Sequence, residues 1–147
     1  MLHPKLSSPG NVLRSLLDQP PLIAPGVYDA ITAKLAEQAG AKAVYLSGAG
    51  VTNSMTAMPD IGLLTMDEMA RQANYVCSAV QVPVIADADT GYGESWNVMR
   101  TVREFERAGL AGLHLEDQMS PKRCGHLDGK QVIPASDMAA QITAAVK

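Results

Sequence analysis

The 147-residue chain lacks the features that mark several common protein classes. It has only two cysteines, Cys77 and Cys124, and their spacing fits neither a disulfide framework nor a C-x-x-C metal site. No stretch reaches the roughly 18 uninterrupted apolar residues of a membrane span, and the first ten residues lack the apolar segment of a secretion signal. The sequence therefore predicts a cytoplasmic protein in a reducing environment, with no membrane partner.

Excess positive charge is also missing. The chain has 12 basic and 15 acidic residues and a net charge of -3, so we expect no nucleic-acid partner. It contains neither a G-x-G-x-x-G sequence nor a Walker A sequence, which leaves nucleotide binding without support. A hydrophobic fraction of 47% against 18% charged residues is typical of one globular domain, here residues 1–147. A small molecule is the expected partner.

Short apolar segments alternate with amphipathic ones, which indicates parallel βα units and an α/β fold. Thr65 and Glu68 have the spacing of a capping box, Ser136 with Asp137 predicts another helix start, and Gly109 is expected to end a helix. The expected strands are 22–24, 43–46, 82–86 and 111–115, and the expected helices are 13–18, 29–39, 65–80, 94–108 and one from Ser136 to the end.

Carboxylates, hydroxyls and glycines follow every expected strand. In a β/α barrel or an open parallel sheet, the carboxyl ends of the strands line one pocket. Asp87 and Asp89 come after the third strand and would repel each other unless a cation lies between them, which favours Mg²⁺ or Mn²⁺. The alternative is that Asp89 caps a turn and Asp87 caps the next helix. Glu116 leaves the neighbouring strand at the same height and strengthens the metal interpretation, whereas Asp117 is the better candidate for a simple cap.

A polar loop of about eighteen residues follows the fourth strand, and such a long connection suggests a functional lid. Within it, Cys124 is flanked by Lys122, Arg123 and His126, and cationic neighbours favour the reactive thiolate. The alternative is a surface loop with an incidental cysteine. Cys77, beside apolar residues in a helix, is expected to be a small buried hydrophobe.

Three further positions are weaker candidates. Ser47-Gly-Ala-Gly50 offers backbone N–H groups and a hydroxyl to a carboxylate or phosphate. The side chain of Tyr45 faces either the barrel interior or the helices, and core packing is the default expectation. Asp60 lies in a loop without helical or strand periodicity. It either orients the ligands of a metal site without binding the metal itself, or is simply solvated.

Four of these motifs together resemble the isocitrate lyase / phosphoenolpyruvate mutase superfamily, and its 2-methylisocitrate lyases and carboxyvinyl-carboxyphosphonate phosphorylmutase-like proteins most of all. The resemblance runs from about Leu13 to the last residue. The motifs occur in the expected order: Tyr-Leu-Ser-Gly-Ala-Gly (45–50), Asp-Ala-Asp-Thr-Gly-Tyr-Gly (87–93), Gly-Leu-His-Leu-Glu-Asp-Gln (112–118) and Lys-Arg-Cys-Gly-His (122–126).

The resemblance implies a (β/α)8 barrel that binds Mg²⁺ and a 2-oxo or 2-hydroxy acid at the carboxyl ends of its strands. Asp89 would bind the metal directly, with Asp87 and Glu116 acting mostly through water and Asp60 ordering the water shell. Tyr45 would lie near the substrate hydroxyl as a candidate base. Ser47, Gly48 and Ala49 would hold the substrate carboxylate; Ala49 replaces the glycine that the family often has. Cys124 would protonate the carbanion, and Lys122, Gly125 and His126 would shape the loop.

The function implied is a Mg²⁺-dependent C–C lyase that releases pyruvate or a related 2-oxo acid from 2-methylisocitrate or a 2-alkylmalate-like acid. A P–C bond mutase or hydrolase, or an oxaloacetate decarboxylase, is the first alternative, and Cys124 argues against it because those members commonly lack the cysteine. The second alternative is an inactive half-barrel that binds metal or self-associates.

Family members are nearly twice as long as this chain. Lys147 falls inside the expected fourth barrel helix, so about four strands are present, and the chain resembles an N-terminal fragment. The absent half would supply an arginine and a glutamate near the substrate. Open sheet edges and uncovered apolar surface favour pairing with another copy, which predicts a homo-oligomer.

Overall fold

The computed structural model describes residues 6–19, 21–125 and 127–147, and its centre is a four-stranded sheet. The strands lie side by side in chain order, and each neighbouring pair is parallel. In order along the chain, the elements are α1 (Pro9–Leu17), β1 (Gly26–Val27), α2 (Ala30–Gln38), β2 (Val44–Leu46), α3 (Gly48–Thr56), α4 (Met66–Ala79), β3 (Val84–Asp87), α5 (Ser95–Ala108), β4 (Gly112–His114) and α6 (Ala135–Ala145).

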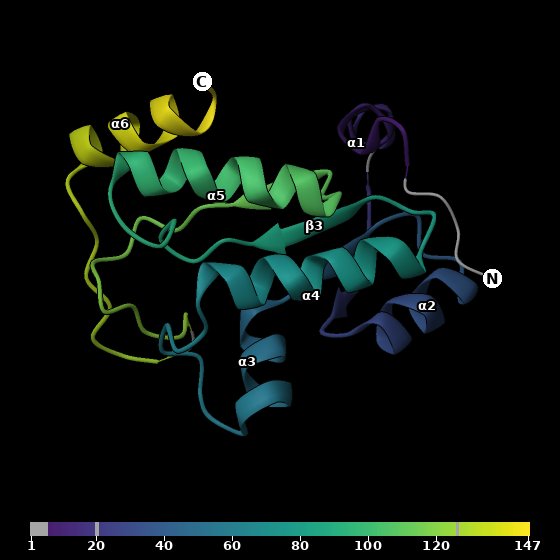
Figure 1. Ribbon diagram of the computed structural model, residues 1–147, viewed down its shortest axis with the longest axis horizontal. Helices are drawn as coiled ribbons and strands as arrows, with labels where there is room; N and C mark the ends of the chain where they lie inside the picture. The colour runs from purple at the N-terminus through teal and green to yellow at the C-terminus, as the bar shows by residue number, and fades with distance from the viewer. Residues whose placement is uncertain (1–5, 20, 126) are drawn as a thin grey trace.

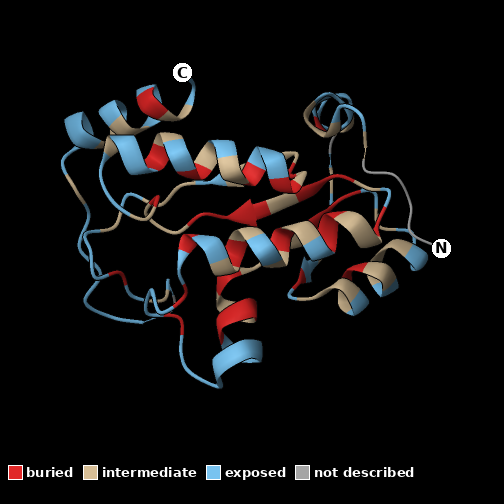
Figure 2. Cartoon of the chain, in the orientation of Figure 1, coloured by how far each residue is buried: buried red, intermediate tan, exposed pale blue. Residues whose placement is uncertain are grey.

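One face of the sheet carries the hydrophobic core. Helices α2, α4 and α5 pack in sequence beside one another, and Figure 1 shows α4 and α5 lying along β3. Val44 and Leu46 of β2 are completely buried, as is Phe105 of α5. Because side chains alternate across a strand, Tyr45 between them belongs to the other face, where it is only half-buried. The opposite face of the sheet can therefore carry a site, while the helices bury the core (Figure 2).

Most expected elements are present, and two of the helix ends form as the sequence predicts. The Thr65 side chain accepts a hydrogen bond from the Glu68 amide at the start of α4, and the Glu68 carboxylate accepts one from the Thr65 amide. Gly109 ends α5 with φ of 105°, a left-handed conformation that favours glycine. Cys77 is buried in α4, as expected.

Two local predictions are wrong, and one helix was not predicted. Residues 22–24 are not a strand: β1 begins at Gly26, and Ile23 is 76% exposed. Residues 48–50 form the first turn of α3, a helix that the glycines and the hydroxyl-rich sequence concealed. Helix α6 begins at Ala135 after Pro134, so Ser136 and Asp137 lie inside it and do not cap it with a side chain.

Within the described ranges, no helix has the length and apolar character needed to cross a bilayer.

Candidate active site

The turn after β3 fixes two of the predicted acidic residues. Asp87 is the last residue of β3, and its Oδ1 accepts a hydrogen bond of 2.9 Å from the Asp89 amide. Asp89 has φ of 46°, a left-handed conformation that turns its side chain back over the strand ends. The Glu116 amide donates to the Asp89 carbonyl at 2.8 Å, so the turns after β3 and β4 are joined. Asp87 therefore caps its own turn, and it does not cap the next helix.

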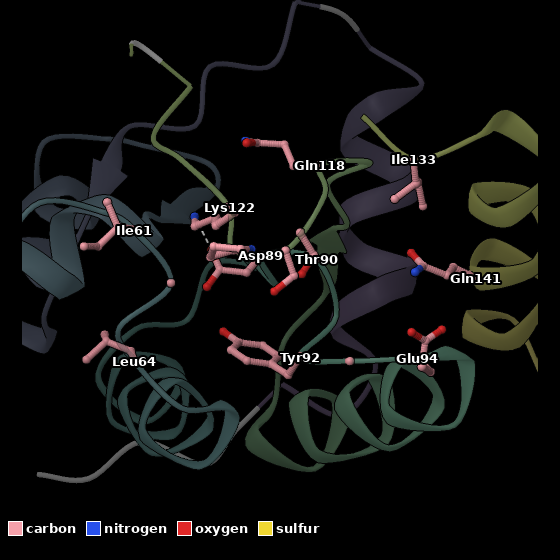
Figure 3. A pocket seen from close by; sticks show the side chains of 14 residues that line it. Ile61, Leu64, Asp89, Thr90, Tyr92, Glu94, Gln118, Lys122, Ile133 and Gln141 are labelled. Carbon is pink, nitrogen blue, oxygen red and sulfur yellow. Dashed lines mark ion pairs between the residues drawn. The ribbon is translucent and has the colours of Figure 1, made fainter. Parts of the chain in front are cut away.

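Lys122 reaches this turn from the long loop after β4. It is 5% exposed, and its Nζ lies 2.9 Å from Asp60 Oδ1 and 3.0 Å from Asp60 Oδ2. The same ammonium pairs with Asp89 Oδ1, as Figure 3 shows. Asp60 is buried, so it is not the solvated loop residue that one of the alternatives described. The ion pair brings together residues from three separate loops.

The electrostatics of this group follow from burial and crowding. Burial raises the pKa of Asp89, Lys122 opposes that rise, and the nearby Asp87 and Asp60 add to it. Burial alone would lower the pKa of the Lys122 ammonium, but its contacts with Asp89 and Asp60 raise it above the usual value. Burial also raises the pKa of Glu116, with Asp87 and Asp89 contributing. The carboxylates at the strand ends thus carry negative charge that a single lysine does not balance.

This charge surplus bears on the predicted metal site. Across the described ranges, no three His, Cys, Asp or Glu side chains are grouped closely enough to hold an ion in their present arrangement, and the Lys122 ammonium lies between two of the acids. Asp87 nevertheless adds to the rise in the pKa of Asp89, and Asp87 and Asp89 both add to the rise in the pKa of Glu116. Oxygen ligands with a net negative charge suit Mg²⁺ or Mn²⁺. In its chemistry, this set of oxygen donors fits a hard divalent cation.

Tyr45 lies on the face of the sheet away from the helices, so the default expectation of core packing is wrong. Its hydroxyl is 3.2 Å from His114 Nδ1 on β4, and the two rings lie 5.2 Å apart. Burial raises the pKa of Tyr45 to about 12, and Asp87 and Glu116 add to the shift because they disfavour a second negative charge. His114 is a site residue that sequence reasoning did not assign, although its position two residues before Glu116 on a strand was a usable signal.

The predicted carboxylate-binding residues surround the start of α3. Ser47 caps this helix by accepting a hydrogen bond of 3.1 Å from the Gly50 amide. A Cβ at Gly48 would lie 2.7 Å from Asp87 Oδ2, so the helix backbone comes into close contact with the carboxylate at the end of β3. The first amides of a helix lack partners within it, and they suit an anionic ligand. Ala49 is in the same turn and is partly buried.

The rest of the loop after β4 shows a half-buried Cys124, the residue expected to protonate the product. The Gly125 carbonyl accepts a hydrogen bond from the Lys130 side chain. Sequence reasoning did not assign Gln118, whose side chain contacts both Glu116 and the loop backbone. His126 lies outside the described residues.

A cavity of about 340 Å³ opens beside the Asp89–Lys122 pair. Figure 3 shows Thr90 and Tyr92 on the β3 side of it and Gln118 on the β4 side. Burial raises the pKa of Tyr92, and Asp89 is the first of the nearby carboxylates that add to the shift. The cavity therefore lies directly beside the buried ion pair of the site.

Known proteins resemble the chain along nearly its whole length. A family model described as phosphoenolpyruvate phosphomutase matches residues 13–147. The 2-methylisocitrate lyase of Aeropyrum pernix is 54% identical over 142 residues, which make up 96% of this chain and 46% of that protein. The family expected from the four motifs is the one that matches.

Solved structures agree. An oxaloacetate acetylhydrolase in complex with the inhibitor 3,3-difluorooxalacetate superposes with a TM-score of 0.91 at 40% identity, covering 97% of this chain and 50% of that chain. A phosphonopyruvate hydrolase complex with oxalate and Mg²⁺ superposes with a TM-score of 0.85 at 33% identity, covering 95% and 47%. The chain spans about half the length of these relatives, which confirms the expected N-terminal half of a (β/α)8 barrel.

Proposed function

The chain belongs to the phosphoenolpyruvate phosphomutase family. On that premise we propose that it is the part of a C–C lyase that carries the acidic residues at the strand ends and Cys124. The substrate would be 2-methylisocitrate or a 2-alkylmalate-like acid, and the product pyruvate or a related 2-oxo acid. One observation carries the proposal: the buried contact of Lys122 with Asp89 and Asp60 draws the loop with Cys124 onto the carboxyl ends of the strands.

The residues divide the chemistry among them. Cleavage removes the substrate hydroxyl proton and breaks the neighbouring C–C bond, so a carbonyl forms on one fragment and an electron pair remains on the other. The Cys124 thiol gives its proton to that electron pair. The first turn of α3, after Ser47, holds a carboxylate through its backbone amides. Tyr45 would lie next to the substrate hydroxyl, but its phenol stays protonated and is a poor base, because burial, and then Asp87 and Glu116, raise its pKa. A bound cation would offset the two carboxylates.

Asp87, Asp89 and Glu116 would hold Mg²⁺ or Mn²⁺, with Asp60 supporting the water shell. A divalent cation bound there supplies Lewis-acid polarisation of the substrate oxygen. For this ion to bind, Lys122 must give up at least its contact with Asp89 and keep Asp60 as its partner.

The test is pyruvate release from 2-methylisocitrate by the 147-residue chain in the presence of Mn²⁺, followed with a lactate dehydrogenase coupling. We expect Cys124→Ser to lower turnover by about 100-fold or more, because serine is a far weaker acid than cysteine. Cys77→Ala is the matched control, since this cysteine is buried in α4, and it should keep turnover. Full activity in Cys124→Ser would overturn the lyase assignment. Turnover of phosphonopyruvate or oxaloacetate alone would favour the P–C or decarboxylase alternative.

A further inference from the structure

The side chain of Gln118 links the end of β4 to the loop that carries Cys124. Its Nε2 donates to Glu116 Oε2 at 2.8 Å and to the Arg123 carbonyl at 2.9 Å. Its Oε1 accepts from the Arg123 amide at 3.2 Å. The three contacts define which end of the amide is nitrogen, because both partners of Nε2 are acceptors and the partner of Oε1 is a donor.

The two hydrogen bonds between the Gln118 side chain and the Arg123 backbone resemble those between neighbouring β-strands. The glutamine amide has two N–H donors and an acceptor oxygen. One donor and the oxygen pair with the C=O and the N–H of Arg123, and the second donor is left for Glu116. The same amide faces Glu116, one of the carboxylates at the strand ends. A single side chain thus joins the loop backbone to the acidic group.

Arg123 separates the two loop residues to which the proposed function assigns roles. Lys122 on one side is buried against Asp60 and Asp89, and Cys124 on the other side is half-buried. The base of the loop is held elsewhere, by backbone hydrogen bonds from the Met119 amide to the Gln131 carbonyl and from the Ile133 amide to the Asp117 carbonyl. Without the Gln118 clamp, the Lys122 ion pair would still tie the segment to the strand ends. The hydrogen bonds from the Leu127 amide to the Cys124 carbonyl and from the Arg123 side chain to the Asp128 carbonyl stay within the loop.

We propose that Gln118 is a positioning residue that holds the Lys122–Cys124 segment over the strand ends by clamping Arg123 and bracing it against Glu116. The proposal rests on the proposed function in one respect: the purpose of the clamp is to place the Cys124 thiol at the substrate. The clamp itself is a property of the loop, and it can be measured without substrate or metal.

The experiment is limited trypsin digestion of the 147-residue chain, with mass spectrometry to follow cleavage of the Arg123–Cys124 bond. Gln118→Met keeps the length of the side chain and removes all its hydrogen bonds. Two lost backbone contacts should raise the open population of the segment, and with it the cleavage rate, by about tenfold. Cleavage after Arg100 on α5 reports global unfolding and should stay unchanged. The matched control is Gln131→Met, the same substitution at an exposed position of the same loop.

A second pair of variants tests the polarity of the clamp. Gln118→Glu places a carboxylate against Glu116 and against the Arg123 carbonyl, so it should open the segment at least as much as Gln118→Met. Adding Glu116→Gln supplies a donor at position 116 that pairs with the new carboxylate. We expect the double variant to recover at least half of the lost protection, which a general loosening of the loop would not produce.

A measurement on the unaltered chain complements the variants, in case one of them fails to fold. The Arg123 amide should exchange with solvent deuterium at least tenfold slower than in an unstructured peptide, because it donates to Gln118 Oε1. Exchange at the unstructured rate overturns the proposal, as does equal cleavage of Gln118→Met and the unaltered chain, or equal opening by Gln131→Met. Failure of the lyase assay alone leaves the clamp intact, so the two proposals fail separately.

Discussion

The loops after β3 and β4 both bring charged residues to the same edge of the sheet, but they are held in different ways. The β3 loop is short and held by backbone geometry: Asp89 and Tyr92 both have positive φ, and the Gly91 carbonyl accepts a hydrogen bond of 3.1 Å from Thr101 of α5. The β4 loop is long and mostly exposed. Backbone hydrogen bonds join its base, and the side chains of Lys122 and Gln118 hold the segment near Cys124.

The difference shows how the two parts of the site are specified. The packing that stabilises the fold also places Asp87 and Asp89, so fixing their positions costs the chain little additional conformational entropy. The loop with Cys124 is attached to the strand ends through the polar contacts of Lys122 and Gln118, and a ligand can replace such contacts. Substitutions in the first loop should therefore act on the free energy of unfolding. Substitutions in the second loop should act mainly on its local position, except at the buried Lys122.

The largest effect is expected from Gly91→Ala in the β3 loop. Gly91 has φ of 85°, and a Cβ there would lie 2.5 Å from Val98 Cγ2 and 3.0 Å from Leu115 Cδ1. Backbone strain and overpacking together should lower the free energy of unfolding by about 4 kcal/mol. Urea denaturation followed by circular dichroism measures this.

The matched control for Gly91 lies in the other loop. Nothing comes within 4 Å of a Cβ added at Gly125, so Gly125→Ala should change the free energy of unfolding by less than about 0.5 kcal/mol. Equal losses in the two variants would contradict the distinction between a packed loop and an attached one.

The second effect is expected from Lys122→Met. The variant leaves Asp60 and Asp89 buried without their cation, and breaking a buried pair in this way costs about 3 kcal/mol. The loss should depend on pH with a definite sign. The folded pKa of Asp89 is already raised, and it rises further without the lysine. Stability that such a group contributes is present below its unfolded pKa and is lost as pH rises through the folded pKa, so the variant should be most impaired at neutral pH and recover on acidification.

Lys130→Met is the control for that measurement. Lys130 lies in the same loop and donates to the Gly125 carbonyl, but it is exposed, and it pairs with no buried carboxylate of the residues that the structure describes. Its free energy of unfolding should stay within about 0.5 kcal/mol of the unaltered chain at both pH values. A pH-independent loss in Lys122→Met would indicate lost packing of the lysine stem and not an uncompensated charge.

The same contrast explains what the sequence could and could not predict. The acidic turn after β3 and the joining of β3 to β4 follow from strand periodicity and from the rule that parallel strands end at one edge. Helix α3 was missed because Gly48 and Gly50 are poor helix formers, and its start depends on the tertiary position of Ser47. The Lys122–Asp60 contact joins two separate loops that lack periodicity, and its residues are 62 positions apart, so no local pattern predicts it.

The smallest effect on the fold, and the sharpest on the site, is expected from Gly48→Ala. The new Cβ would lie 2.7 Å from Asp87 Oδ2, so the carboxylate must rotate, while alanine favours the helix that begins there. These effects oppose each other, and we expect a loss of about 1 kcal/mol in the free energy of unfolding. A carboxylate turned from its place should weaken Mn²⁺ binding by about tenfold, measured by electron paramagnetic resonance. Gly26→Ala, with nothing within 4 Å of its Cβ, should leave Mn²⁺ binding unchanged. If Gly48→Ala binds Mn²⁺ as tightly as the unaltered chain, Asp87 is not a ligand, and the metal site must be assigned to Asp89 and Glu116 without it.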